Sequence, residues 1–541
     1  MIENEKPGES YWKQLARVGT PMRVAWFFIA LGVAFRAVQY LFNAALYVDE
    51  GALALNIIKR SFAGLMQPLD SEQAAPLGFL VLEKIAFLLF GDSEYSLRLF
   101  PFLFSIAALV LFYETAKRLL QPWAATIALA LFAVSSHTIY YASQIKQYSS
   151  DQAFALLILL AGLEIDSKEL TARRTALFAA AGAFVVWFSH PSVFVLAGVG
   201  GALALAAVRH RDWARFWRLA GVVAIWLLSF AMFYLLSVRN LSGNQTLEAS
   251  WAKKGTFLPL PPRSLADLEW IPRALVKMFS NPFGLPFSTL AALVFLLGAV
   301  ALFLKNKRWL LMLVGPIAIT MLASGVHKYP FGRRLLLFLL PAALLVVGAG
   351  LDFILQKKRP YSILVTAVIV ALLFIQPAGG ATNNMLHPQA RQDIRPIMAY
   401  VRDHRRPGDV IYVYHHQRES FQYYAKKFGF DESAYVLGID ARDQSKRRND
   451  WRAYEMDLDQ LRGRERVWLT FSHVRRIQGI REDEFMLRYA SGFGTLLDKF
   501  VVDEEPPDPE ADEAEQPETL DFTPAPASAY LFDLSKPAAH L

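Results

Sequence analysis

The chain has 541 residues, of which 54% are hydrophobic and 19% are charged, and its mean hydropathy is +0.28. The apolar residues are concentrated in blocks of about 16 to 25 residues, a length that matches the hydrocarbon core of a bilayer. This composition excludes a soluble enzyme and a disordered chain. Cysteine is absent, which excludes a disulfide framework, a thiolate metal site and a cysteine nucleophile.

The formal net charge of +8 is unevenly distributed along the chain. The positive excess precedes residue 378 and lies between apolar blocks, whereas residues 379–541 are net acidic. In a membrane protein, loop bias explains such basic residues better than nucleic-acid binding does. We therefore expect no nucleic-acid partner.

Eleven apolar blocks predict transmembrane helices. In chain order these blocks are 22–46, 98–116, 122–140, 151–165, 174–189, 191–207, 216–237, 286–305, 308–325, 333–355 and 361–378. A twelfth apolar stretch, 76–90, is short and contains Glu83 and Lys84. If this stretch does not cross, the short basic loops all lie on the side of the N-terminus, as the positive-inside rule requires. We therefore interpret 76–90 as a juxtamembrane or re-entrant helix.

The predicted topology divides the chain into a cytoplasmic tail (1–21), a transmembrane domain (22–378) and an extracytoplasmic domain (379–541). The tail is polar and lacks a cleavage site after the first apolar block, so we interpret it as retained. The predicted outer-face loops of the transmembrane domain are 48–97, 141–150, 238–284 and 326–332.

The region after residue 378 predicts a small α/β domain, because helical and strand patterns alternate along it. Its predicted elements are a helix at Asp393–Arg405, a strand at Val410–Tyr414, a helix at Arg418–Lys427, a strand at Val467–Ser472, a helix near Asp483–Tyr489 and a strand at Ala529–Leu534. Residues 503–518 are acidic and rich in proline, which predicts a disordered insertion. The expected fold class is an all-α polytopic membrane domain followed by this α/β domain.

Two adjacent carboxylates, Asp49 and Glu50, follow the first apolar block on the predicted outer side. Carboxylates are costly beside lipid unless they have partners or a function. In one interpretation Asp49 is the N-cap of an amphipathic helix over 51–62 that lies on the membrane. In the other, Asp49 is a general base that accepts a proton from an attacking hydroxyl. The two roles are compatible, and the sequence leaves both open.

A polar segment, Tyr140–Asp151, joins two predicted crossings on the outer side. If the segment is helical, one stripe contains Tyr141, Gln144, Tyr148 and Asp151, and the neighbouring faces contain Lys146 and Gln147. Such a density of polar side chains suits a hydroxyl-rich ligand such as a sugar. An interfacial tyrosine belt with Asp151 as a helix cap is the alternative, and it leaves the glutamines unexplained.

One short outer loop breaks the positive-inside rule because Lys328, Arg333 and Arg334 are gathered there beside His327 and Tyr329. We interpret this group as a site for an anion such as a lipid phosphate. The alternative is that the basic side chains extend to phospholipid headgroups.

Several other polar residues suggest structural roles. The pair His415-His416 and His473 lack the ligand spacing of a zinc site, and we assign them to the structure of the soluble domain. We assign Arg36 and Arg98 to packing or snorkelling. The chain contains no P-loop, dinucleotide-binding glycine motif or HExxH motif.

Taken together, the motifs resemble the GT-C superfamily of lipid-dependent glycosyltransferases. The nearest resemblance is to the bacterial family (glycosyltransferase family 39 type) that contains lipid A aminoarabinose transferases and protein O-mannosyltransferase-like enzymes. The matching motifs, spread over about residues 20–380, are Asp49-Glu50, the stretch from Ala75-Pro-Leu-Gly to Leu89-Phe-Gly91, Arg98-Leu-Phe-Pro101, Lys146-Gln-Tyr-Ser-Ser-Asp151 and Tyr329-Pro-Phe-Gly-Arg-Arg334.

The resemblance implies an inverting transfer of a sugar from a polyprenyl-phosphate donor to an acceptor hydroxyl or amine. It implies a multi-pass protein of the inner membrane with a periplasmic C-terminal domain, whose partners are the bilayer, the lipid-linked donor and a glycan, lipid or protein acceptor. Asp49 would be the base and Glu50 would position the acceptor or maintain the geometry. Residues implied in binding the donor phosphate are Lys328, Arg333, Arg334 and Lys146. Residues implied in binding the sugar or acceptor are Tyr141, Gln144, Gln147, Tyr148, Asp151, His327 and Tyr329.

One departure from the family pattern concerns the donor phosphate. The aminoarabinose transferases have a basic residue just before the proline, whereas this chain has Ala75 before Pro76. Phosphate binding would then fall to Lys146 or to the 328–334 segment. Some members of the superfamily use a divalent metal at the acidic pair, so a metal stays an open possibility here.

A function of a different class is compatible with the same residues. A transporter or flippase for a lipid-linked glycan would also need polar and basic residues to bind its cargo. Such transporters tend to contain internal repeats and interrupted helices in matching positions, and this chain shows no convincing similarity between its halves. A non-catalytic partner protein would be expected to lack the Asp49-Glu50 pair, which is present. We therefore favour the enzyme.

Overall fold

The computed structural model describes residues 7–237, 245–357, 359–388, 392–443, 448–477, 479–502 and 526–535. The predicted insertion at 503–518 lies outside these residues. The chain forms two compact units: residues 1–42 and 60–388 make the membrane unit, and residues 43–59 and 389–541 make the second unit. The second unit therefore combines the C-terminal α/β domain with a short segment from the beginning of the chain.

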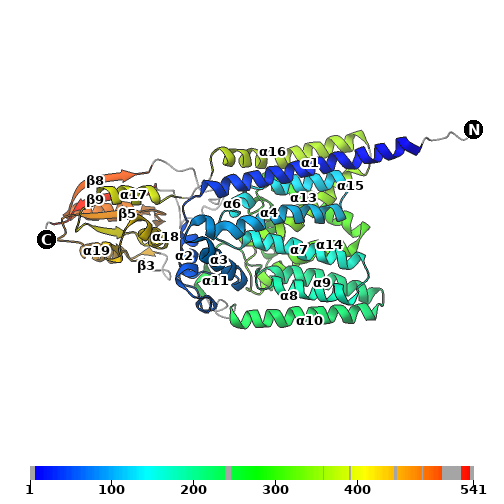
Figure 1. Cartoon of the computed structure of the whole chain (residues 1–541), viewed down its shortest axis with the longest axis horizontal. Coiled ribbons are helices and arrows are strands. Elements are labelled where there is room, and N and C mark those ends of the chain that lie inside the picture. The colour runs from blue at the N-terminus through cyan, green and yellow to red at the C-terminus, as the bar shows by residue number, and fades with distance from the viewer. Residues whose placement is uncertain are drawn as a thin grey trace, which may run out of the picture. The chain divides into compact units, whose positions relative to one another are not determined.

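The membrane unit is almost entirely helical (Figure 1). Its helices are α1 (Pro7–Phe42), α3 (Leu77–Phe90), α4 (Glu94–Leu119), α5 (Pro122–Ala133), α6 (Ser136–Tyr141), α7 (Tyr148–Ser167), α8 (Ala172–Val185), α9 (Ser192–Arg209), α10 (Trp213–Leu236), α11 (Gln245–Lys253), α12 (Leu265–Ser280), α13 (Ser288–Lys305), α14 (Lys307–Gly325), α15 (Leu340–Leu355) and α16 (Pro360–Leu386), with 3-10 turns η1 (Gly64–Met66) and η3 (Arg333–Leu339). The long helices run side by side, with α1 and α16 along one edge of this unit and α10 along the other (Figure 1).

In the described part of the chain, nine helices are long and apolar enough to cross a membrane. They correspond to nine of the eleven predicted crossings, and the chain is a multi-pass membrane protein. The other two predicted crossings are shorter helices, α5 with 12 residues and α8 with 14. Each stops early: α5 is separated from α6 by Val134 and Ser135, and α8 ends in turns before Pro191. The stretch interpreted as juxtamembrane forms α3, a 14-residue helix that is not among the nine.

Close helix contacts depend on glycine where α13 crosses α15. A β-carbon added to Gly298 would lie 1.9 Å from the carbonyl oxygen of Val346, and one added to Gly350 would lie 2.3 Å from the carbonyl oxygen of Val294. Helices in lipid gain little hydrophobic free energy by associating, so close van der Waals packing of small residues stabilises such crossings. Substitution of either glycine would separate the two helices.

Buried Arg36 connects α1 to the segment that leads into the predicted sugar site. Its guanidinium donates to the carbonyl oxygens of Gly32 (2.9 Å) and Ala133 (3.1 Å) and to Thr138 Oγ1 (2.7 Å). Arg36 is 0% exposed and Arg98 is 1% exposed. Of the two roles predicted for these arginines, the structure therefore supports packing and not snorkelling.

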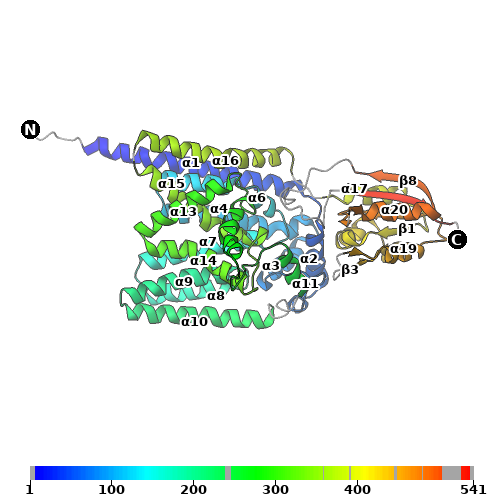
Figure 2. The ribbon, with the colours of Figure 1, turned by 180° about the vertical axis from the view of Figure 1, so that it is seen from behind.

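In the second unit, helices cover both faces of a five-stranded sheet (Figure 2). Its strand order is β2-β1-β5-β9-β8, with β1 parallel to β2 and β5 and with β9 antiparallel to β5 and β8. The elements are α2 (Val48–Lys59), α17 (Arg395–His404), β1 (Val410–Val413), η4 (His415–Gln417), α18 (Arg418–Ala425), η5 (Lys426–Phe428), η6 (Glu432–Ala434), β2 (Tyr435–Leu437), β3 (Arg442–Asp443), β4 (Arg448–Asn449), α19 (Trp451–Asp459), β5 (Val467–Phe471), β6 (Arg476–Ile477), β7 (Ile480–Arg481), α20 (Glu482–Phe493), β8 (Thr495–Val501) and β9 (Ser528–Asp533).

Central strand β5 is buried on both faces of the sheet. All five of its residues are buried, as expected for a strand with helices on both faces. Leu469 faces a core that includes Tyr454 of α19 and Met486 of α20. The ring of Trp468 faces the other way and lies 6.1 Å from the ring of Tyr400 on α17. The alternating helices and strands predicted for this region are thus present as an α/β domain.

Candidate active site

The acidic pair lies in the first turn of α2. The carbonyl oxygen of Tyr47 accepts from the amide of Gly51 (2.8 Å), so Tyr47, and not Asp49, is the N-cap residue. The N-cap role considered for Asp49 is therefore wrong, because the helix begins before it. Glu50 instead reaches back, and its Oε2 accepts from the Tyr47 amide (3.3 Å) in the manner of the third residue of a capping box.

The two carboxylates differ in their access to solvent. Glu50 is 1% exposed and bonds to the helix N-terminus, whereas Asp49 is only partly buried. A base must reach the hydroxyl whose proton it accepts. Asp49 fits that requirement better than Glu50.

The prediction that this helix lies on the membrane is wrong. Its apolar residues Leu53 and Ile57 are each 0% exposed and therefore do not contact lipid. Helix α2 packs instead against α18 within the second unit.

The polar segment from Tyr140 to Asp151 is not a continuous helix, so the predicted four-residue stripe is wrong. Helix α6 ends at Tyr141, and α7 begins at Tyr148. The turn between them nevertheless returns Tyr148 to Tyr141, and the ring centroids lie 4.7 Å apart. Ser149 Oγ also donates to the carbonyl oxygen of Tyr141 (3.1 Å).

All the predicted polar residues of this segment are buried. Relative exposures range from 2% to 8% for Tyr141, Gln144, Lys146, Gln147, Tyr148 and Asp151. Buried polar side chains are costly unless they have partners or bind a ligand. An interfacial tyrosine belt would be exposed to headgroups, so this alternative does not fit the observed burial.

Lys146 is held by a residue that the motifs did not single out. Its Nζ donates to Gln73 Oε1 over 2.7 Å. Gln73 lies in the loop that leads to Ala75 and Pro76, where the aminoarabinose transferases have their basic residue. No motif pointed to Gln73, because a lone glutamine in a polar loop carries no recognisable signal.

The basic segment 328–334 meets the polar segment through Arg334. The Arg334 guanidinium carbon lies 6.0 Å from the ring centroid of Tyr148, within the range of a cation–π interaction. Leu337 packs with Tyr141 and Tyr148 in one apolar cluster, which brings η3 against α7. Tyr329 Oη donates to the carbonyl oxygen of Leu335 (2.8 Å), which closes the loop.

His327 and Lys328 differ from the two arginines because both are exposed. The His327 ring stacks on Phe257 (4.4 Å between centroids), and its Nδ1 lies 3.1 Å from Glu248 Oε1. These contacts join His327 to helix α11 and to the loop that follows it. Arg333 lies next to Arg334 with φ at 52°, a left-handed conformation that a non-glycine residue adopts at a cost.

The contact of Arg334 with Tyr148 and the packing of η3 against α7 bring two of the predicted polar segments together in the membrane unit. Lys146, Arg333 and Arg334 supply three positive charges, and Asp151 is the one acidic residue among the predicted site residues of this unit. Fixed cations in a partly dry site stabilise a phosphate strongly, because little solvent must reorganise.

A buried carboxylate elsewhere in the membrane unit belongs to α3. Glu83 is 0% exposed, and within the described residues neither of its carboxylate oxygens has a hydrogen-bond partner. Burial raises the pKa of Glu83 well above its ordinary value. The adjacent Lys84 places its ammonium 4.7 Å from the Phe87 ring centroid.

The histidines of the second unit have the structural contacts expected of them. His416 Nδ1 donates to the carbonyl oxygen of His473 (2.9 Å), and Ser472 Oγ lies 2.7 Å from His473 Nδ1. Across the described ranges, no group of three or more His, Asp or Glu side chains is arranged to hold a metal ion.

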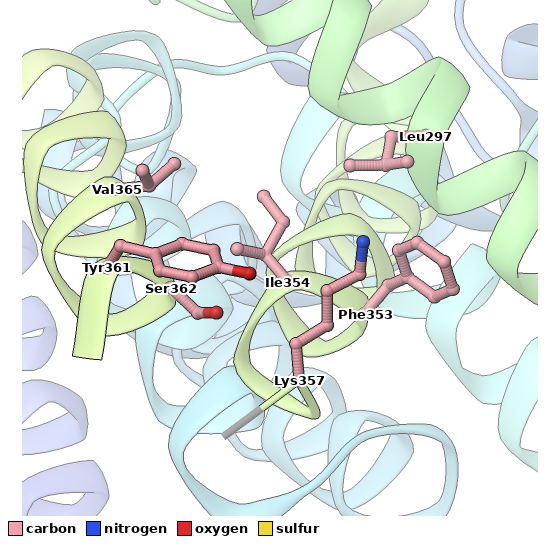
Figure 3. Close-up of a pocket in the computed structure, with 7 residues that line it drawn as sticks. All are labelled: Leu297, Phe353, Ile354, Lys357, Tyr361, Ser362 and Val365. Carbon is pink, nitrogen blue, oxygen red and sulfur yellow. The ribbon is translucent and has the colours of Figure 1, made fainter. Parts of the chain in front are cut away.

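A hollow of about 180 Å³ lies between helices α13, α15 and α16 of the membrane unit (Figure 3). Leu297 of α13, Phe353 and Ile354 of α15 and Tyr361 of α16 line it. These residues are near the opposite end of α15 from Arg334, roughly 25 Å away along the helix. The hollow is largely apolar, and none of the predicted site residues lines it.

Known proteins share a part of this sequence and its fold. The family model for dolichyl-phosphate-mannose-protein mannosyltransferase matches residues 74–235. No curated protein sequence matches the chain. Among solved structures, the chain is similar to ArnT from Cupriavidus metallidurans in the apo state, with 15% identity, a TM-score of 0.52 and coverage of 93% of this chain and 97% of that chain.

Two further structures show the same fold with a lipid phosphate bound. ArnT from Cupriavidus metallidurans bound to undecaprenyl phosphate has a TM-score of 0.53 at 15% identity, and 93% of this chain and 97% of that chain are covered. AglB, an archaeal oligosaccharyltransferase from Archaeoglobus fulgidus in complex with an inhibitory peptide and a dolichol-phosphate, has a TM-score of 0.50 at 12% identity, with coverage of 86% and 70%.

The chain has the fold of these membrane glycosyltransferases, the GT-C fold. Residues 74–235 are similar to the dolichyl-phosphate-mannose-protein mannosyltransferases. None of these relatives is a transporter, so the comparisons give the flippase alternative no support.

Proposed function

We propose that the chain is an inverting glycosyltransferase that moves a sugar from a polyprenyl-phosphate donor to an acceptor. The observation that carries this proposal is the contact between Arg334 and the ring of Tyr148 in a chain with the GT-C fold. This contact joins the two polar segments that were predicted separately. Relatives with this fold bind undecaprenyl phosphate and dolichol-phosphate, which are phosphates on long isoprenoid chains.

In the proposed reaction, an acceptor oxygen or nitrogen attacks the anomeric carbon of the sugar. Its bond to that carbon forms as the bond from the carbon to the phosphate oxygen breaks on the opposite face, which inverts the configuration. Asp49 accepts the proton of the acceptor, and the polyprenyl phosphate leaves with the bonding electron pair. Glu50 keeps the first turn of α2 in place through its bond to the Tyr47 amide.

Cations stabilise the departing phosphate, because negative charge accumulates on it in the transition state. We assign this role to Arg333, Arg334 and Lys146, with Lys328 contributing to capture of the lipid at the surface. Tyr141, Gln144, Gln147, Tyr148 and Asp151 are the side chains proposed to bind the sugar, and His327 and Tyr329 are proposed to border the acceptor.

The proposed location is the inner membrane, with the N-terminus in the cytoplasm and the α/β domain in the periplasm. The basic loops between the helices support this orientation. The proposed acceptor is a glycan, lipid or protein on the outer face.

The test uses purified full-length protein in nanodiscs, a panel of labelled polyprenyl-phosphate sugars and membrane extract as acceptor. Release of polyprenyl phosphate by the wild type, with a loss of about 10²–10⁴ in rate for Asp49→Asn, is the expected result. Donor binding should be nearly unchanged in that variant. Equal rates in both proteins would remove Asp49 from the mechanism, and tight donor binding without any release would favour transport.

A further inference from the structure

The helix that carries Asp49 belongs to the same compact unit as the C-terminal domain, and not to the membrane unit. Residues 43–59 fold against residues 389–541 across a very large separation in sequence. The Leu46 amide, for example, donates to Tyr424 Oη over 3.0 Å, although 378 residues separate the two. Tyr424 is 1% exposed, so this bond is shielded from water and is costly to lose.

A helix–helix contact at Gly51 continues this attachment. A β-carbon on Gly51 would lie 2.9 Å from the amide nitrogen of Ser420 and 3.0 Å from its Cα. Both atoms belong to the backbone of α18, which cannot turn aside as a flexible side chain would. Gly51 directly follows Asp49 and Glu50, so any separation of the two helices at this point moves the acidic pair.

The chain entering α2 is held at two further places. Arg395 donates to the carbonyl oxygen of Asn43 (3.0 Å) while its guanidinium pairs with Asp393 (2.5 Å). The ring of Tyr47, the N-cap residue, meets the ring of His473 edge to face at 4.8 Å. Contacts with the C-terminal domain therefore fix this segment both before and after the acidic pair.

We propose that the C-terminal domain positions Asp49 for catalysis through Tyr424 and through the close contact of Gly51 with Ser420. This inference rests on the proposed function, because it assigns positioning residues to the base of that reaction. Tyr424 and Gly51 are positioning residues that act through α2. The domain is thus part of the catalytic apparatus, in addition to any binding of acceptor.

The test compares Gly51→Ala and Tyr424→Phe with two matched controls in the full-length protein in nanodiscs. Gly492→Ala makes the same change in helix α20, where an added β-carbon meets no atom within 4 Å. Tyr412→Phe removes another phenol that is 1% exposed, one that donates to Asp457 Oδ2 of α19 (2.6 Å).

A shift of about 1 Å in a reacting group costs about 100-fold in rate, so kcat should fall by about that factor in Gly51→Ala. Loss of one buried hydrogen bond predicts a fall of about fivefold in Tyr424→Phe. The KM for donor should stay at the wild-type value in both variants. Their rates should still fall at low pH as in the wild type, but from a lower maximal rate. Asp49→Asn, by contrast, should abolish this fall at low pH.

The possible outcomes separate this inference from the proposed function. If the wild type releases polyprenyl phosphate and both test variants match their controls in kcat, the positioning role is overturned and the reaction stands. If the wild type releases nothing from any donor, the proposed function itself fails. If thermal unfolding shows that Gly51→Ala is not folded, the milder variant Tyr424→Phe decides. A fall in its kcat without a change in unfolding temperature or in the KM for donor supports the proposal.

Discussion

Acidification should destabilise the second unit, and His416 provides the group through which this can be measured. His416 Nδ1 donates to the carbonyl oxygen of His473. Burial of the ring, followed by the nearby charges of Arg475, His473 and His415, lowers the pKa of His416 well below its ordinary value of 6.5. The ring is therefore neutral in the folded protein at pH values that protonate it in the unfolded chain.

The sign and size of the effect follow from this difference in proton binding. Below about pH 6.5 the unfolded state binds more protons than the folded state, so stability falls as the pH falls. With an unfolded pKa of about 6.5, a change from about pH 7.5 to about pH 5.5 removes about 1.4 kcal/mol through His416 alone. For a unit of this size, the unfolding temperature should fall by about 3–6 °C.

The assay follows hydrogen exchange of the β1 and β5 amides in the full-length protein at both pH values. His416→Asn keeps an amide donor near the position of Nδ1 and does not titrate, so its loss of stability should be smaller by about 1.4 kcal/mol. His404→Asn is the matched control, because His404 is exposed and also bonds through Nδ1 to a carbonyl oxygen, that of Tyr400 (2.9 Å). Equal pH responses in wild type and His416→Asn would refute the reasoning.

Three further predictions concern the acidic pair, the phosphate site and the helix crossing. Glu50→Gln should retain kcat within about threefold, because the amide oxygen still accepts from the Tyr47 amide; steady-state turnover measures this, and a loss as large as that of Asp49→Asn would make Glu50 a base. Arg334→Ala should weaken donor binding by about tenfold or more, since a charge-assisted contact is lost; titration with polyprenyl phosphate in nanodiscs tests it, and unchanged affinity would remove Arg334 from the phosphate site. Gly298→Ala should destabilise the membrane unit by about 1–3 kcal/mol in detergent unfolding, whereas Gly379→Ala, with no atom within 4 Å of the added β-carbon, should have little effect.

The elements that depend on local pattern were predictable from the sequence. Long apolar blocks gave the membrane helices, because twenty apolar residues suit few other structures. The predicted helix at Asp393–Arg405 is α17 (Arg395–His404), and the predicted strand at Val467–Ser472 is β5 (Val467–Phe471). Strand β8 was not predicted, because an edge strand with mostly exposed residues lacks the apolar alternation that identifies a strand.

What covers an apolar face was not predictable from its periodicity. Helical spacing of Leu53 and Ile57 correctly indicated one apolar face, but lipid and protein bury such a face equally well. The partner, α18, is several hundred residues away in sequence, and no local signal identifies it. The same limit applies to Arg334 and Tyr148, whose proximity depends on the packing of η3 against α7.

The family motif places a basic residue just before the proline, where this chain has Ala75. Lys146 can supply the positive charge that is then missing from this loop. A basic side chain just before Pro76 would bring a positive charge to this loop along the chain itself. Here Lys146, from the turn before α7, brings its ammonium within 2.7 Å of Gln73, two residues before Ala75. Gln73 is a neutral partner, so this hydrogen bond orients the ammonium without cancelling its charge. The requirement of the proposed mechanism is for a cation at a place in the fold, and a residue distant in sequence meets it as well as one inside the motif.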